Sequence, residues 1–304
     1  MEWSPDILAG FEAASIGDIT LIRPDAPLTS PRAAVLHVHG YNDYFYQADL
    51  ADWFRERGIE FYAVDMRRSG RSLKSGDHPH DMADIAEQGD DIQAAVDAMR
   101  ELHPDLPLVV HAHSTGALAA AIWVADRAPA HLKGVILNSP LFGLQMSKLD
   151  RAKLRGLPLL RRVAPTAVVA RRPAIYAKYL HVSGGGPADF DTTWKTPAGV
   201  PARTTWVYAV IRAWARIEAG LTIPVPALVA RSDSCGPETD DNPRLREQDV
   251  VVDTEATARL IPKLGPNARE LVITNGIHDL TQSSAEPRAA YFAGVEAFLD
   301  EVLS

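Results

Sequence analysis

The amino-acid sequence predicts an α/β fold: a doubly wound, mostly parallel sheet with helices on both faces. Short runs rich in Val, Ile and aromatic residues alternate along the chain with longer stretches of helical periodicity. The short runs are apolar throughout, which is typical of parallel strands that are buried on both faces. The repeated order of strand, helix and strand therefore predicts a doubly wound sheet.

The individual elements follow from these two patterns. Six apolar runs are predicted as strands, at residues 33–39, 59–65, 106–112, 134–137, 227–230 and 271–274. A helix is predicted over residues 81–102, where apolar residues recur at helical spacing and acidic residues gather near the start. Residues 115–127 are predicted to form an Ala-rich helix that ends before Pro129, and residues 288–303 a terminal amphipathic helix.

The composition is that of an ordinary globular protein. Of 304 residues, 46% are hydrophobic and 23% are charged, which excludes a disordered, collagen-like or coiled-coil chain. Thirty-one Lys and Arg against 39 Asp and Glu give a net charge of −8, so binding to nucleic acid is not expected. The single cysteine, Cys235, allows neither an intrachain disulfide nor a Cys-based metal site.

The length fits one large domain with an inserted lobe. Residues 1–6 are acidic and do not resemble the start of a signal peptide. Apolar runs stay well short of the ~18 residues that a membrane span requires. We therefore expect a soluble, cytoplasmic protein.

One region breaks the alternation of strands and helices. Residues 141–220 show no strand pattern and contain repeated prolines, so we predict a helical cap, or lid, inserted into a core of residues 1–140 and 221–304. Between residues 148 and 181 the chain has nine Lys or Arg and one acid, Asp150, which gives +8 there and −16 elsewhere. This basic run is either a solvated face or a surface that attracts anionic lipids or acidic substrates.

The strongest chemical signal is a serine at a predicted junction of strand and helix. A buried strand runs into Ser114 and a helix starts directly after it, which lifts the serine hydroxyl onto the carboxyl edge of the sheet. The sharp turn needs small residues two positions before and after the serine, and these are Ala112 and Gly116. Ser114 is therefore a candidate nucleophile, and the alternative is a simple helix N-cap.

A second signal lies at the end of an earlier strand, in the dipeptide His39-Gly40. In a serine hydrolase the loop at this place supplies one backbone N–H of the oxyanion hole, and the residue after the nucleophile supplies the other. The expected donors are the amides of Tyr41 and Thr115. The alternative is an ordinary turn from strand to loop.

A histidine follows the last predicted strand. His278 lies in a Gly-containing turn before the terminal helix, from which an imidazole can reach Ser114 as a general base. The chain order of serine, acid and histidine then places the acid between the fifth predicted strand and His278. Asp233, Asp249 and Asp253 are the candidates in that interval.

Together these motifs resemble the serine hydrolases of the α/β-hydrolase fold, in particular their monoacylglycerol lipase and lysophospholipase-like branch (serine aminopeptidase S33 type). The similarity covers most of the chain and rests on His39-Gly40 with Tyr44, residues 63–72, the serine turn, Asn138-Ser139-Pro140 and residues 276–279. In that branch the catalytic acid begins a D-x-x-x-D segment, which residues 249–253 match. The resemblance thus implies a triad of Ser114, Asp249 and His278. An extra polar stretch, residues 234–248, keeps Asp233 and Asp253 as alternatives.

The resemblance implies a carboxylic ester hydrolase that cleaves a monoacylglycerol, a lysophospholipid or a similar small hydrophobic ester through an acyl-enzyme. The same triad also serves acyl transfer and the hydrolysis of thioesters, lactones or amides, and an inert ligand-binding member of the fold is a third hypothesis. No metal ion or organic cofactor is expected. The expected partners are the ester and, through the basic cap, an anionic lipid surface.

Overall fold

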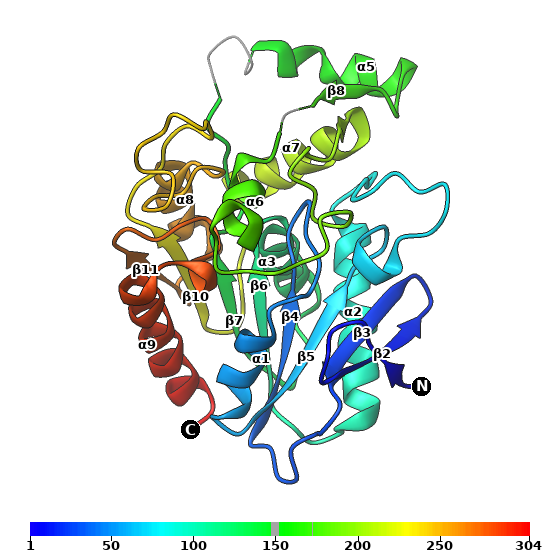
Figure 1. The fold of residues 1–304 in the computed structure, drawn as a ribbon, viewed down its shortest axis with the longest axis vertical. Helices are drawn as coiled ribbons and strands as arrows, with labels where there is room; N and C mark the ends of the chain where they lie inside the picture. The colour runs from blue at the N-terminus through cyan, green and yellow to red at the C-terminus, as the bar shows by residue number, and fades with distance from the viewer. Residues whose placement is uncertain (147–151, 172) are drawn as a thin grey trace.

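The computed structural model describes residues 1–146, 152–171 and 173–304, and a nine-stranded sheet lies at its centre. The strand order is β1-β2-β3-β5-β4-β6-β7-β10-β11 (Figure 1). The strands are β1 (Ser4–Pro5), β2 (Phe11–Ile16), β3 (Ile19–Pro24), β4 (Ala33–Val38), β5 (Ile59–Asp65), β6 (Leu108–His113), β7 (Leu132–Asn138), β10 (Ala227–Ser232) and β11 (Ala268–Ile273). The six from β5 to β11 in this order pair in parallel, whereas β1, β2 and β3 are antiparallel. The predicted mostly parallel α/β fold is confirmed.

Helices cover both faces of the sheet (Figure 1). Among the helices on its faces are α1 (Ala48–Arg55), α2 (Ala86–Leu102), α3 (Ser114–Arg127) and α9 (Ala285–Val302). Successive side chains of a strand point to opposite faces. In β4, Val35 therefore joins the core with α1 and α9, while Leu36 joins the core with α2 and α3. Burial on both sides explains why the strands are apolar throughout.

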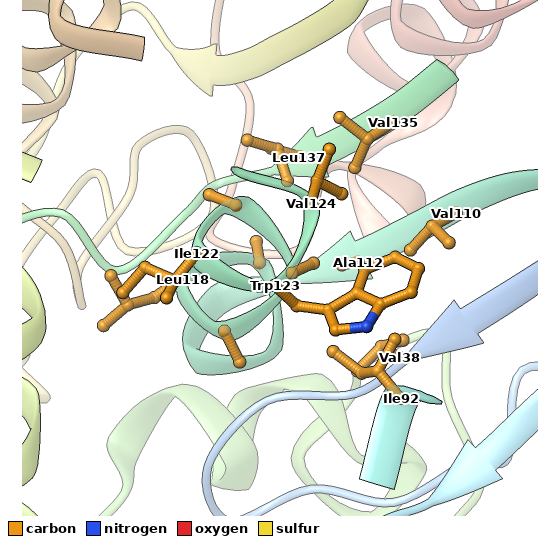
Figure 2. Close-up of a cluster of buried hydrophobic side chains, with 14 of the residues drawn as sticks. Val38, Ile92, Val110, Ala112, Leu118, Ile122, Trp123, Val124, Val135 and Leu137 are labelled. Atoms are coloured by element: carbon orange, nitrogen blue, oxygen red, sulfur yellow. The ribbon is translucent and has the colours of Figure 1, made fainter. Parts of the chain in front are cut away.

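The core beneath α3 supports the segment that begins at Ser114 (Figure 2). Figure 2 shows the indole of Trp123, on α3, beside Val110 of β6 and Ile92 of α2. The ring is buried, and its N–H donates to Gln93 Oε1 at 2.9 Å. Small alanine side chains on the same helix allow it to lie close to the strands. The start of α3 is therefore held by a well-packed core.

The antiparallel strands at one edge of the sheet were not predicted from the sequence. Strands β2 and β3 form a hairpin in which Ile16 pairs with Ile19, so Gly17 and Asp18 are its two-residue turn. Gly17 has φ of 62°, a conformation that glycine adopts without strain. A Gly-Asp pair between two apolar runs is a recognised hairpin signal.

Residues 141–220 contribute no strand to the nine-stranded sheet, among the residues that the structure describes. The described part of this inserted segment includes the helices α5 (Leu157–Val163), α6 (Ile175–Leu180) and α7 (Thr204–Ala219). The expectation that it holds no strand was wrong, because β8 (Val168–Ala170) and β9 (Ala202–Arg203) form a small antiparallel pair. Strands of three and two residues are too short to show a periodic pattern. Figure 1 shows α5 and β8 at the far top, away from the sheet.

Four members of the basic run, Lys148, Asp150, Arg151 and Arg172, lie outside the described residues. Beyond the inserted segment, α8 (Thr254–Leu260) follows β10 and precedes β11. Across the described ranges, no helix combines the length and apolarity needed to cross a membrane.

Candidate active site

Ser114 stands at the junction that the sequence predicts, where β6 ends at His113 and α3 begins. Its φ of 54° lies in the left-handed region, which a non-glycine residue adopts at a cost of about 1–3 kcal/mol. Two residues later, a Cβ on Gly116 would overlap the backbone carbonyl of His39. The absence of a side chain at Gly116 therefore allows the turn to lie directly against the end of β4.

His278 follows β11 and reaches Ser114 across the edge of the sheet. Its Nε2 lies 3.0 Å from Ser114 Oγ, and its Nδ1 lies 2.9 Å from Asp249 Oδ2. In the tautomer that this arrangement requires, Nδ1–H donates to Asp249 and Nε2 accepts from the serine hydroxyl. The imidazole is therefore placed between a hydroxyl and a carboxylate.

Asp249 is fully buried and is oriented by its own backbone surroundings. Its Oδ1 accepts the N–H groups of Val251 and Val252, both at 2.8 Å, which leaves Oδ2 for His278. An isolated β-bridge between the backbones of Cys235 and Asp249 holds Asp249 near the end of β10. The polar stretch between β10 and the acid therefore loops out and returns to the sheet edge.

The two alternative acids make other contacts. Asp233 Oδ1 accepts the N–H of Asn275 at 3.2 Å, which ties together the loops after β10 and β11. Asp253 is the N-cap of α8, and its Oδ1 accepts the N–H of Ala256 at 2.9 Å. Of the three candidates, Asp249 is the one that hydrogen-bonds to His278 in the part of the chain that the structure describes.

The loop after β4 passes directly beside the serine. A Cβ on Gly40 would lie 2.9 Å from Ser114 Cβ and 3.4 Å from its Oγ, so a larger residue here would crowd the nucleophile. The amide of Tyr41 has no acceptor among the residues that the structure describes. Thr115 lies in the first turn of α3, where N–H groups have no acceptor within the helix. The two predicted donors are thus both available to a ligand.

Two residues to which the sequence motifs assign no role, Tyr176 and Asp279, lie beside His278. The ring of Tyr176, on α6, lies edge-on to that of His278 at 5.6 Å, and its hydroxyl accepts the N–H of Asp279 at 3.0 Å. The Asp279 carboxylate accepts from Asn138 Nδ2 at 2.8 Å and from Thr281 Oγ1 at 2.7 Å. Nearby charges and hydrogen bonds lower the pKa of Asp279 despite the opposing effect of burial. In the sequence, Asp279 appears as the last residue of the motif at residues 276–279, without a role of its own.

The histidines of β4 and β6 are buried beside this site. Burial lowers the pKa of His113 to about 4, and the His113 ring lies 4.7 Å from that of His278. His37 and His111 face each other with Nδ1 atoms 2.9 Å apart, and His111 Nε2 lies 2.8 Å from the Tyr291 hydroxyl. His37 and His111 thus contact other core groups and support the sheet, whereas His113 packs against the ring of His278.

A cavity of about 690 Å³ opens between the inserted segment and α8, and neither Ser114 nor His278 is among its lining residues. The N–H of Leu141 donates to the Ser114 carbonyl at 3.0 Å, and the next residue, Phe142, lines the cavity. The rest of its lining is mixed, with apolar Leu144, Ile211, Trp214 and Leu260 and charged Glu218, Asp253, Glu255 and Arg259. Within the described ranges, no group of three or more His, Cys, Asp or Glu is arranged to hold a metal ion.

Comparison with known proteins identifies the family. Residues 29–234, more than half of the chain, match the family described as serine aminopeptidase, S33 (Hydrolase_4). The chain belongs to this family of serine hydrolases. This S33 family member is 29% identical over 140 residues to the phospholipase YtpA of Bacillus subtilis, covering 46% of this chain and 52% of the relative. It is 30% identical over 129 residues to a monoacylglycerol lipase of Mycolicibacterium smegmatis, covering 42% and 45%. The chain thus matches these curated relatives over about half of their length.

Solved structures share the fold of this S33 family member. A soluble variant of monoglyceride lipase from Saccharomyces cerevisiae aligns with a TM-score of 0.70 at 15% identity, over 96% of this chain and 94% of that one. The monoacylglycerol lipase of Paleococcus ferrophilus aligns with a TM-score of 0.64 at 16% identity, over 90% and 97%. These similarities confirm the α/β-hydrolase fold.

Proposed function

We propose that this protein is a serine carboxylic ester hydrolase, like a monoacylglycerol lipase or lysophospholipase, that cleaves small hydrophobic esters. The observation that carries the proposal is the continuous chain of hydrogen bonds from Ser114 through His278 to Asp249, at 3.0 and 2.9 Å. A serine hydroxyl at its ordinary pKa is a weak nucleophile and needs an adjacent, oriented base. Here His278 is the base, and Asp249 is the group that orients it.

The proposed reaction proceeds in two halves through an acyl-enzyme. Ser114 Oγ attacks the ester carbonyl while His278 Nε2 takes its proton, and Asp249 stabilises the imidazolium that forms. His278 then gives this proton to the leaving alcohol as the ester C–O bond breaks. In the second half, His278 takes a proton from the water that attacks the acyl carbonyl, and it returns this proton to Ser114 Oγ as the bond between Oγ and the acyl carbon breaks and the acid leaves.

The amides of Tyr41 and Thr115 are proposed to bind the oxyanion of each tetrahedral intermediate. Gly40 brings the Tyr41 loop against the serine, and the left-handed turn at Ser114 places Thr115 in the first turn of α3. A donor of this kind typically lowers the barrier by about 3–4 kcal/mol. Because neither N–H needs to break an existing bond, the site is prepared for the developing charge.

One observation supports an ester as the substrate class. The two curated relatives are named as a phospholipase and a monoacylglycerol lipase, which cleave esters. The family description also names an aminopeptidase, so amide hydrolysis is the competing reaction that an experiment must include.

We further propose that residues 141–220 form a cap over this site and that its outer arm, residues 152–171, touches anionic lipid. In that arm Leu159 and Val163 are 69% and 70% exposed. Arg155 and Arg162 belong to the same arm, and neither forms an ion pair with any residue that the structure describes. Exposed apolar side chains among unpaired cations are the combination that binds an anionic lipid interface.

Vesicle sedimentation tests the lipid contact. The protein is expected to bind vesicles that contain phosphatidylglycerol at low salt, to bind neutral vesicles less, and to lose binding as salt is raised. The double variant Leu159→Ser/Arg162→Ser should bind these vesicles more weakly and should hydrolyse a soluble ester at the wild-type rate. Equal binding to anionic and neutral vesicles would remove this proposal and leave the esterase proposal standing.

The esterase proposal is tested with a substrate panel. Purified protein is assayed with p-nitrophenyl butyrate and octanoate, a monoacylglycerol, a lysophosphatidylcholine and an amino-acid p-nitroanilide, beside the folded Ser114→Ala variant. We expect the esters to be cleaved and the anilide to be cleaved far more slowly. Cleavage of the anilide alone, or ester cleavage that Ser114→Ala retains, would contradict the proposal.

A further inference from the structure

The inserted segment is bound to the loop after β4 by a row of polar contacts. Each of four consecutive loop residues, Tyr41, Asn42, Asp43 and Tyr44, contacts residues 191–200. We call residues 41–44 the oxyanion loop and residues 191–200 the strap. The contacts are spaced along the whole loop, so they restrain its path and not one side chain alone.

The most buried of these contacts is an ion pair. Lys195 Nζ lies 2.8 Å from Asp43 Oδ1, and the two side chains are only 4% and 3% exposed. The same ammonium donates to the Tyr46 hydroxyl at 3.2 Å and lies 5.0 Å from the centre of that ring. A buried ion pair costs desolvation and is at best a weak source of stability. Its value here is geometric, because it specifies one position for Asp43.

Asn42 forms the second restraint. Its Nδ2 donates to the Thr196 carbonyl at 3.0 Å, and its Oδ1 accepts the Thr196 N–H at 2.9 Å, so the side-chain amide pairs with the strap as a strand would. Asn42 also has φ of 53°, a backbone conformation that needs support in a non-glycine residue. The pairing therefore holds a turn that lies immediately after Tyr41.

These contacts surround the peptide group that carries a proposed oxyanion donor. The peptide between Gly40 and Tyr41 is followed directly by Asn42 and Asp43, and a donor must stay within a few tenths of an ångström of its productive position. The far side of the loop is also held, because the Phe45 N–H donates to buried Asp65 Oδ1 at 2.8 Å. The strap and Asp65 together therefore restrain the oxyanion loop on both of its sides.

We propose that Lys195 and Asn42 are positioning residues that hold the Tyr41 amide in place for catalysis, and that the strap is a fixed brace of the active site. The inference rests on the proposed function, because it assigns a role within that reaction. Neither side chain touches the substrate. Their removal should lower transition-state stabilisation and leave ground-state binding nearly unchanged.

The test compares Lys195→Met and Asn42→Gly with Lys178→Met. Asn42→Gly removes the amide pairing while glycine tolerates the positive φ. Lys178 also lies in the inserted segment and forms an ion pair with Asp240 at 2.7 Å. The two side chains are 50% and 54% exposed, so Lys178 is the matched control for a buried lysine. For each variant we measure kcat and KM on p-nitrophenyl butyrate, the inhibition constant of an alkyl trifluoromethyl ketone and the melting temperature.

We expect kcat to fall about 10- to 100-fold in Lys195→Met and Asn42→Gly, with KM changed by less than about threefold. The trifluoromethyl ketone, which forms a tetrahedral adduct, should lose affinity by a similar factor, and Lys178→Met should match the wild type. If Lys195→Met does not fold, Asn42→Gly decides. Folded variants with wild-type kcat and inhibitor affinity would overturn the inference, whereas an inactive wild type would overturn the proposed function itself.

Discussion

Gly116, in the first turn of α3, lies against the backbone carbonyl of His39 at the end of β4. The contact joins the two segments that carry the proposed oxyanion donors, since Thr115 precedes Gly116 and Tyr41 follows His39 by two residues. A close approach of two backbones is possible only where one residue has no side chain. The distance between the two donors therefore depends in part on the absence of a side chain at Gly116.

Replacing Gly116→Ala should damage both stability and activity. The added methyl group would overlap the His39 carbonyl and separate the helix from the loop after β4. We expect a loss of about 1–3 kcal/mol in the free energy of unfolding, measured by urea denaturation, and a fall in kcat of at least about tenfold. Gly156→Ala is the control, because a Cβ there meets nothing within 4 Å. An equal, small effect of both substitutions would contradict the role of this contact.

The choice of acid is tested by three Asp→Asn variants. Asp249→Asn should lower kcat by about 10³- to 10⁴-fold, because an amide cannot hold the required tautomer or stabilise the imidazolium. Asp233→Asn and Asp253→Asn should stay within a few fold of the wild type, since their carboxylates hold a loop and cap a helix. Asn is also a good N-cap, so Asp253→Asn should fold normally. A near-normal rate for Asp249→Asn would make the assignment wrong.

Buried histidines predict that stability falls on acidification. Burial lowers the pKa of His111 from its usual 6.5 to about 4, so between these pH values the unfolded chain binds more protons than the folded one. The free energy of unfolding therefore falls as pH falls from 6.5 towards 4, by on the order of 2–3 kcal/mol for such a histidine.

Urea midpoints measured at several pH values check this dependence. His111→Gln should flatten the pH profile, while His78→Gln, at an exposed histidine, should leave it unchanged. A wild-type midpoint that does not move between pH 6.5 and 4 would contradict the account.

The fold could be predicted because its core strands are buried on both faces. Their continuous apolarity marks β4, β5 and β6 clearly, and the predicted ranges differ from the observed ones by a few residues at most. The edge hairpin of β2 and β3 was missed because its strands are less uniformly apolar and the Gly17-Asp18 turn was not used. The strand β8 was missed because it pairs with residues more than 30 positions later in the chain, in β9, and no local pattern indicates such a contact.

The candidate site divides in the same way. Ser114 and His278 each occupy a position that follows a strand, so topology alone brings them to one edge of the sheet. Asp249 is separated from β10 by a long polar stretch, and the choice needed a family resemblance. Tyr176 and Lys195 come from the inserted segment, in a part where no sequence motif marks them. Their contacts with His278 and Asp43 appear only once the chain is folded.

The central claim is that His278 makes the hydroxyl of Ser114 a nucleophile, and active-site labelling tests it most directly. Wild type, Ser114→Ala and His278→Ala are treated with a fluorophosphonate probe, and the modified peptide is located by mass spectrometry. We predict that the wild type is labelled on Ser114, that Ser114→Ala takes no label, and that His278→Ala reacts far more slowly. A folded wild type that takes no label, or takes it at another residue, would contradict the claim.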